Sequence, residues 1–124
     1  MKKILVAGFA SLLSCVNQYS APKQYDVAEA KIKLAQCLAQ EAEFFGAYWC
    51  PACIKQEKAF GPDAWNVFKK NYIECSDRSP PEERQRCDKE EFETFPFWKF
   101  KNGEKINGYK TLEQLAKLSG CDNH

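Results

Sequence analysis

The amino-acid sequence predicts a single α/β domain with the element order α-β-α-β-α-β-β-α. Its 124 residues suffice for one domain of ordinary size. Segments with apolar residues at three- and four-residue steps alternate with short apolar runs, as expected for alternating helices and strands. Near the end, strand-like runs at 97–101 and 104–109 flank Asn102-Gly103, a dipeptide favoured in tight hairpin turns.

The composition excludes several classes of protein. Eighteen basic and 17 acidic residues give a formal net charge of +1, so no strong field would attract nucleic acid. No apolar run reaches the roughly 20 residues of a transmembrane helix. Seven cysteines are many for this length, and they favour disulfides in an exported protein or metal binding in a reducing compartment.

The N-terminal residues indicate export. Met1-Lys2-Lys3 is basic, and the apolar stretch 4–13 is too short to span a bilayer but suits a signal peptide. Leu12-Leu13-Ser14-Cys15 resembles the lipobox of bacterial lipoproteins, in which the cysteine becomes the lipidated first residue. We therefore expect a signal peptide at 1–14, a tether at 15–23 and the domain at 24–124. The alternative is an ordinary signal peptide in which Cys15 is incidental.

The first half of the domain is expected to hold three helical segments and two strands. Asp26-Val-Ala-Glu29 has capping-box spacing and opens a helix to about Gln40, with Val27, Leu34 and Cys37 on its buried face. Strands are expected at 43–47 and 71–75. Between them, a helix follows Cys50-Pro-Ala-Cys53, Gly61-Pro62 breaks it, and Asp63 opens a second piece.

The second half begins with a charged helix. Ser79-Pro-Pro-Glu82 has capping-box spacing, and the run 82–93 is interpreted as a solvated helix face that contains Cys87. After the hairpin, Thr111-Leu-Glu-Gln114 caps a last helix and Gly120 ends it. Trp65 and Trp98 are assigned to the core.

The Cys50-Pro51-Ala52-Cys53 segment is the candidate active site. Residues three apart on a helix lie about 5–6 Å apart, which matches the Cα separation of a disulfide. If Cys50 is the N-cap and Pro51 the first helical residue, unpaired N–H groups and the positive helix end stabilise a thiolate at Cys50. Cys50 would then be the nucleophile and Cys53 the resolving thiol.

Two other interpretations of this segment remain open. It could be half of a zinc site, but such sites need a second pair of cysteines or histidines. The only histidine is His124, and the other cysteines of the expected domain are single: Cys37, Cys75, Cys87 and Cys121. It could also be a purely structural disulfide.

Several spaced motifs together resemble the thioredoxin-like domain of bacterial vitamin K epoxide reductase homologues and its free-standing relatives. The motifs, which extend from about Tyr25 to Cys121, are 45–53 (FGAYWCPAC), 72–76 (YIECS), Cys87, 95–98 (FPFW) and 112–120 (LEQLAKLSG). The resemblance implies a thioredoxin-like fold with a central four-stranded mixed sheet flanked by helices. It also implies a cis Pro96 that faces the active cysteines, so that Phe95 and Pro96, together with Trp49, would dock a substrate chain.

The resemblance also implies pairings for the other cysteines. Cys75 and Cys87 would form a disulfide beside the active site, either as a brace or as a relay of electrons. Cys37 and Cys121 are also candidates for a disulfide; the alternative is a buried free thiol at Cys37 and a loose one at Cys121.

The sequence departs from the family pattern at two positions. Ala52 stands where relatives often have histidine, so a less oxidising potential is expected. Phe44 stands where thioredoxins carry a buried acid that serves the second cysteine. Glu57, one turn beyond Cys53, could replace that acid, although a solvated Glu57 is the simpler interpretation.

These features predict an exported thiol–disulfide oxidoreductase of the bacterial cell envelope, on the periplasmic side and lipid-anchored through Cys15. It would act as a monomer on protein thiols, without metal or organic cofactor. The resemblance suggests an oxidant recharged by a membrane quinone-linked partner of the vitamin K epoxide reductase type. The alternatives are a reductase or isomerase with a membrane electron donor, and a non-enzymatic lipoprotein with structural disulfides only.

Overall fold

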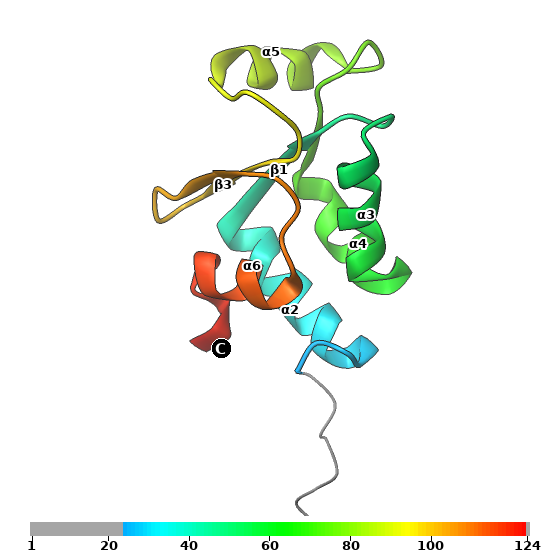
Figure 1. Ribbon diagram of the computed structural model, residues 1–124, viewed down its shortest axis with the longest axis vertical. Helices are drawn as coiled ribbons and strands as arrows, with labels where there is room; N and C mark the ends of the chain where they lie inside the picture. The colour runs from blue at the N-terminus through cyan, green and yellow to red at the C-terminus, as the bar shows by residue number, and fades with distance from the viewer. Residues whose placement is uncertain (1–23, 124) are drawn as a thin grey trace, which may run out of the picture.

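The computed structural model describes residues 24–123, and these form one four-stranded mixed sheet with helices on both faces (Figure 1). The strands are β1 (Ala42–Gly46), β2 (Tyr72–Glu74), β3 (Phe97–Phe100) and β4 (Lys105–Asn107), in the order β2-β1-β3-β4. β1 pairs in parallel with β2 and antiparallel with β3, and β3 forms an antiparallel hairpin with β4. This is a thioredoxin-like arrangement, and it confirms the predicted fold class.

The helices follow the predicted element order. They are α2 (Ala28–Glu41), α3 (Pro51–Phe60), α4 (Pro62–Phe68), α5 (Pro81–Lys89) and α6 (Leu112–Ser119), with short 3-10 turns at Lys69–Asn71 and Cys121–Asn123. Within the described part of the chain, no helix is both long and apolar enough to cross a membrane. The predicted signal peptide, Cys15, the tether and His124 lie outside the described residues.

Two neighbouring residues of β1 show how the sheet divides the core. Side chains of consecutive strand residues point to opposite faces. Phe44 belongs to the larger cluster, which includes buried residues of α2, α3, α4 and α6. Phe45 belongs to a smaller cluster with Ile73 and Phe97, against which Cys75, Cys87 and Phe92 pack. α5 therefore lies on the opposite face from the other helices, as Figure 1 shows.

Stacked aromatic rings fill the larger cluster. Phe44 stacks on Trp98 with ring centroids 4.7 Å apart, and Phe60 stacks on Phe68 at 5.4 Å. Each of these side chains is almost fully buried, and each contributes about 2–3 kcal/mol through removal from water. Trp98 is a core residue as predicted, whereas Trp65 is only partly buried and packs against the edge of the cluster.

Of the three predicted capping boxes, only the one before α6 forms. Thr111 Oγ1 accepts from the Gln114 N–H, and the Gln114 side chain accepts from the Thr111 N–H. The boxes predicted at Asp26 and Ser79 are wrong, because α2 begins after Val27 and α5 after Pro80, neither with a side-chain cap. The Ser79 hydroxyl is engaged elsewhere, with the Glu74 carbonyl and the Ser76 N–H.

Two surface interpretations also need correction. Val27 precedes the first turn of α2 and is 52% exposed, so it does not belong to the buried face. The charged run predicted as a solvated helix to residue 93 leaves the helix after Lys89. Beyond that point, the largely buried Glu90 carboxylate pairs with Lys99 at 2.8 Å, which fastens this segment to β3.

Candidate functional site

Cys50 occupies the N-cap position of α3, and Pro51 is the first residue of that helix. The Cys53 N–H donates to Cys50 Sγ over 3.2 Å, and the Ile54 N–H donates to the Cys50 carbonyl. Proline suits this position because the first helical N–H has no partner within the helix. The sulfur of Cys50 therefore lies where helix donors and the positive helix end stabilise negative charge.

Cys50 and Cys53 are the two free cysteines of the described residues, and both are nearly buried. Cys50 opens onto a surface pocket of about 520 Å³. The pocket is formed by the start of α3 and by the segment that leads from α5 to β3, and its lining residues are Trp49, Cys50, Pro51, Ala52, Phe92, Glu93, Thr94 and Phe95. A partner that enters this pocket would therefore reach Cys50 between aromatic side chains.

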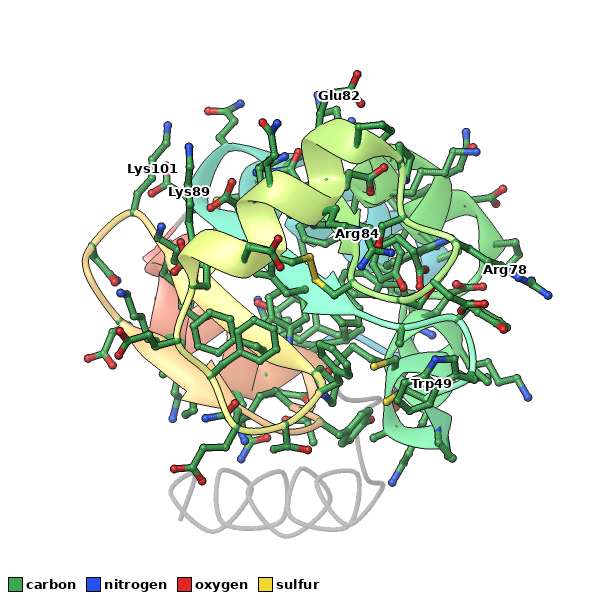
Figure 2. The ribbon with its side chains drawn as sticks, turned by 90° about the horizontal axis from the view of Figure 1, so that it is seen from above. Trp49, Arg78, Glu82, Arg84, Lys89 and Lys101 are labelled. Atoms are coloured by element: carbon green, nitrogen blue, oxygen red, sulfur yellow. A yellow bond between two sulfur atoms is a disulfide. The ribbon has the colours of Figure 1, made fainter. Side chains whose placement is uncertain are left out.

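Trp49 forms the exposed wall of this pocket. Its side chain is 56% exposed and lies at the start of α3, away from the α5 helix (Figure 2). The Trp49 ring packs edge-on against Phe95, with centroids 6.0 Å apart. The Phe95–Pro96 peptide bond is cis, and the Pro96 side chain is fully buried. Of these two residues, Phe95 lines the pocket.

Phe92 is a pocket residue that the sequence analysis missed. The sequence places it in a run interpreted as a solvated helix. In the structure its ring stacks on that of Phe97, with centroids 4.9 Å apart, and packs beside that of Phe95, with centroids 5.2 Å apart. The sequence carries one signal of this role. A single phenylalanine in a charged run has an apolar surface that is expected to pack against another part of the protein.

The Cys53 thiol is as buried as that of Cys50 and lies close to Gly46 of β1. A Cβ atom added to Gly46 would lie 3.1 Å from Cys53 Sγ and 3.0 Å from the Tyr72 ring, so only glycine allows this close packing. Burial, a hydrogen bond with Cys50, and the charges of Cys50 and Glu74 raise the pKa of Cys53 to about 12. Cys53 therefore holds its proton at neutral pH.

A second group of residues near Cys53 was not identified from the sequence. The Tyr72 hydroxyl donates to Glu74 Oε1 at 2.7 Å, and the Tyr48 N–H donates to Glu74 Oε2 at 3.0 Å. Tyr72 and Glu74 belong to β2, two residues apart, and so share one side of the strand. Burial and the neighbouring Glu74 carboxylate raise the pKa of Tyr72.

Gln56 fixes α3 to the rest of the domain. It is fully buried, its amide donates to the Lys110 carbonyl at 2.8 Å, and its oxygen accepts from the Lys110 N–H at 2.9 Å. The nearby Gly108 N–H donates to the Pro96 carbonyl, so the same loop also holds Pro96. A lone glutamine on the buried face of a helix was the signal in the sequence.

The other four described cysteines form two disulfides. Cys37 is bonded to Cys121 with Cα atoms 6.0 Å apart, which joins α2 to the turn after α6. Cys75 is bonded to Cys87 with Cα atoms 5.8 Å apart, which joins the end of β2 to α5. By loop entropy, closing these loops contributes about 4–5 and about 3 kcal/mol respectively. Residues 24–123 contain no cluster of three or more His, Cys, Asp or Glu side chains placed to hold a metal ion.

Comparison with known proteins is in keeping with a thiol-based function. A thiol-disulfide oxidoreductase of Arabidopsis thaliana is 30% identical to the chain over 82 residues, which cover 64% of this chain and 21% of that protein. The chain thus matches about a fifth of the length of that relative. No protein-family profile matches the chain. The fold is thioredoxin-like, and the likeness to the Arabidopsis protein is one of sequence over those 82 residues.

Proposed function

We propose that this protein is a thiol–disulfide oxidoreductase in which Cys50 is the nucleophile and Cys53 the resolving thiol. The observation that carries the proposal is the position of Cys50 Sγ, which accepts the Cys53 N–H at the N-cap of α3 and opens onto the aromatic pocket. The thiol–disulfide oxidoreductase of Arabidopsis thaliana supports the same chemistry.

The reaction needs two exchanges of sulfur bonds. When the protein reduces a substrate, the Cys50 thiolate attacks one sulfur of the substrate disulfide and the other sulfur leaves as a thiolate. Cys53 then loses its proton and attacks Cys50, which forms the Cys50–Cys53 disulfide and releases the second substrate thiol. The same steps in reverse oxidise two substrate thiols.

The substrate chain would dock across the pocket walls. Trp49 and Phe95 provide an aromatic surface beside Cys50, and the buried Pro96 follows Phe95 in the chain. Tyrosine and tryptophan are common anchors of protein interfaces because they present a large, rigid contact area. The pocket therefore suits a peptide segment that flanks a cysteine better than a free small thiol.

The direction of electron flow in this proposal is oxidation of substrate proteins. The recharging partner would be a membrane quinone-linked enzyme of the vitamin K epoxide reductase type, and the protein would be held in the bacterial cell envelope by a lipid on Cys15. The reduction potential of the Cys50–Cys53 pair tests this direction. A value near about −120 mV would support an oxidant, and one near about −270 mV a reductase or isomerase.

The nucleophile is tested by the Cys50→Ser variant in an insulin-reduction assay and in an assay of thiol oxidation. We expect Cys50→Ser to abolish both activities, since serine is not oxidised or reduced. The Cys37→Ser/Cys121→Ser double variant is the control, because it removes a disulfide elsewhere in the domain but leaves Cys50 and Cys53 in place. Activity that survives in Cys50→Ser would contradict the proposal, and inactivity of the wild type would favour a non-enzymatic lipoprotein.

A further inference from the structure

Cys53 opens onto a cavity that is separate from the Cys50 pocket. The cavity has a volume of about 40 Å³, enough for a water molecule, and it is lined by Ala47, Tyr48, Cys53, Ile54, Glu57, Trp65 and Tyr72. None of these residues lines the pocket at Cys50. A larger open groove of about 940 Å³ shares Tyr48, Glu57 and Tyr72 with the cavity and also reaches Glu74. The resolving sulfur therefore has its own polar route to solvent.

Tyr72 and Cys53 both line the cavity at the inner end of this route. Both side chains lie close to Gly46. A Cβ atom added to this glycine would be 3.1 Å from the Cys53 sulfur and 3.0 Å from a ring carbon of Tyr72. The Tyr72 hydroxyl extends from that ring to Glu74 Oε1. Tyr72 therefore lies between the two other groups: it shares the cavity with Cys53, and its hydroxyl bonds to the Glu74 carboxylate in the groove.

The Glu74 carboxylate is held in one orientation. Its two oxygens accept from the Tyr72 hydroxyl and the Tyr48 N–H, and the Glu74 backbone N–H donates to Glu83 Oε1 at 2.8 Å. Arg78 lies over the Tyr48 ring, 3.7 Å from its centroid, and restrains the loop that carries this N–H. A carboxylate fixed by several bonds is better suited to receive a proton along a defined path than a mobile surface group.

The resolving step creates a need for such a group. Burial and the Glu74 charge favour the protonated Cys53 thiol, and both remain when Cys50 is tied up in a mixed disulfide. Cys53 must nevertheless become a thiolate to attack Cys50. Phe44, at the position where the resembled thioredoxins carry a buried acid, is itself buried and cannot take up a proton.

We propose that Glu74 accepts the Cys53 proton during resolution of the mixed disulfide, with the Tyr72 hydroxyl as the relay between the thiol and the carboxylate. The inference rests on the proposed function. In this step the S–H bond of Cys53 breaks, the Tyr72 hydroxyl takes up this proton, and the hydroxyl's own proton passes to the Glu74 carboxylate, to which it is already hydrogen-bonded. The Cys53 sulfur bonds to Cys50 and the substrate sulfur leaves with the electron pair of the broken disulfide. The proton later passes to solvent through the groove.

Glu57 is the competing carboxylate, because it also lines the cavity, but it is less suited to the role. Its side chain is exposed, and among residues 24–123 it makes no hydrogen bond or ion pair. The other titratable or charged groups that line the groove are Lys69, Lys70, Glu83 and Arg86. Glu57 and Glu74 therefore form a matched pair for a test: two carboxylates on one groove, one free to move and one fixed beside Tyr72.

The test measures the two steps separately with the reduced protein and 5,5′-dithiobis(2-nitrobenzoate) in a stopped-flow instrument. The first thionitrobenzoate is released when Cys50 attacks the reagent, and the second when Cys53 resolves the mixed disulfide. We expect Glu74→Gln to slow the second release at neutral pH by about tenfold or more, with the first release unchanged. Tyr72→Phe, which keeps the ring but removes the hydroxyl, should slow the same step, whereas Glu57→Gln should stay within about twofold of the wild type.

The sign of the effect separates proton acceptance from a simple charge effect. Removing the Glu74 charge lowers the pKa of Cys53, which alone would speed the second release. A second release that is unchanged or faster in Glu74→Gln would overturn the inference, and so would normal resolution in Tyr72→Phe. The slowing should diminish as the pH rises, because hydroxide then removes the proton. Absence of the first release in the wild type would instead contradict the proposed function.

Discussion

The Cys53 backbone N–H donates to the Cys50 sulfur over 3.2 Å. This bond joins the two sulfur-bearing residues through one helical turn, and it places Cys50 at the positive end of α3 and Cys53 within the turn. The two thiols consequently differ in environment: Cys50 opens onto an aromatic pocket, and Cys53 packs against Gly46 and Tyr72. A difference of this kind assigns one sulfur to attack and the other to resolution.

Ala52 should set a lower reduction potential than a histidine would. It lies between the cysteines and lines the Cys50 pocket, so a charged side chain there would act on the thiolate. We expect Ala52→His to make the potential of the pair more positive by about 30 mV or more, which is a tenfold change in equilibrium constant. Equilibration with glutathione measures the potential. The Ala52→Gln variant, whose new side chain is neutral, should change the potential less. Equal shifts in both variants would contradict an electrostatic cause.

The raised pKa of Cys53 predicts a loss of stability at alkaline pH in the reduced protein. In the unfolded chain this thiol titrates near 9.0, and in the folded protein near 12. Between pH 9.0 and 12 only the unfolded chain loses this proton, so the free energy of unfolding of the reduced protein should fall as the pH rises through that range.

Urea denaturation of the reduced protein as a function of pH measures this loss. The Cys53→Ser variant is the control, because it keeps Cys50 and Tyr72 but has no thiol at position 53. The free energies of unfolding of the two proteins should diverge above pH 9.0. Parallel curves across that range would show that burial does not restrain the ionisation of Cys53.

Gln56 should be important for stability although it lies outside the reacting pair. Gln56→Leu removes both hydrogen bonds to Lys110 and leaves a backbone N–H and a carbonyl without partners. We expect a loss of about 2 kcal/mol in the free energy of unfolding. The exposed Gln40 of α2 provides a matched control, since Gln40→Leu should change stability by less than about 0.5 kcal/mol. Equal effects of the two changes would contradict a structural role for the Gln56 bonds.

Trp49 should affect protein substrates more than small reagents. Trp49→Ala removes the exposed wall of the pocket without touching either sulfur. We expect the KM for a reduced or oxidised protein substrate to rise by about tenfold, while the rate with a small aromatic disulfide changes little. Val27→Ala, which also removes a half-exposed apolar side chain, should leave both unchanged. A loss of both activities in Trp49→Ala would indicate a folding defect and not a docking role.

Much of the fold could be predicted from the sequence because its signals are local. Helical periodicity, the Asn102-Gly103 turn and the Thr111 capping box depend on residues close together in the chain, and the structure has the corresponding elements. The capping boxes expected at Asp26 and Ser79 do not form. At Ser79 the reason is another set of partners, since its hydroxyl bonds to the carbonyl of Glu74 and to the Ser76 N–H. Spacing alone does not reveal such competing partners.

The part of the candidate site that lies in one stretch of sequence could be predicted. The part that tertiary contacts bring together could not. The Cys50-Pro51-Ala52-Cys53 segment carries its own geometry, so its place at the start of a helix followed from local sequence. Phe92 and Glu74 reach the site from segments far along the chain. Their roles depend on sheet pairing, which brings Phe44 of β1 beside Tyr72 of β2, and no local pattern encodes that register.

The most direct test of the central claim is to trap the mixed disulfide. In the Cys53→Ser variant the first exchange proceeds but resolution does not, so reaction with an oxidised model protein such as insulin should stop at a covalent adduct. Mass spectrometry of the non-reduced digest should find the substrate cysteine bonded to Cys50, and Cys50→Ser should give no adduct. An adduct through Cys53 in Cys50→Ser, or the absence of any adduct in Cys53→Ser, would contradict the assignment of Cys50 as the attacking sulfur.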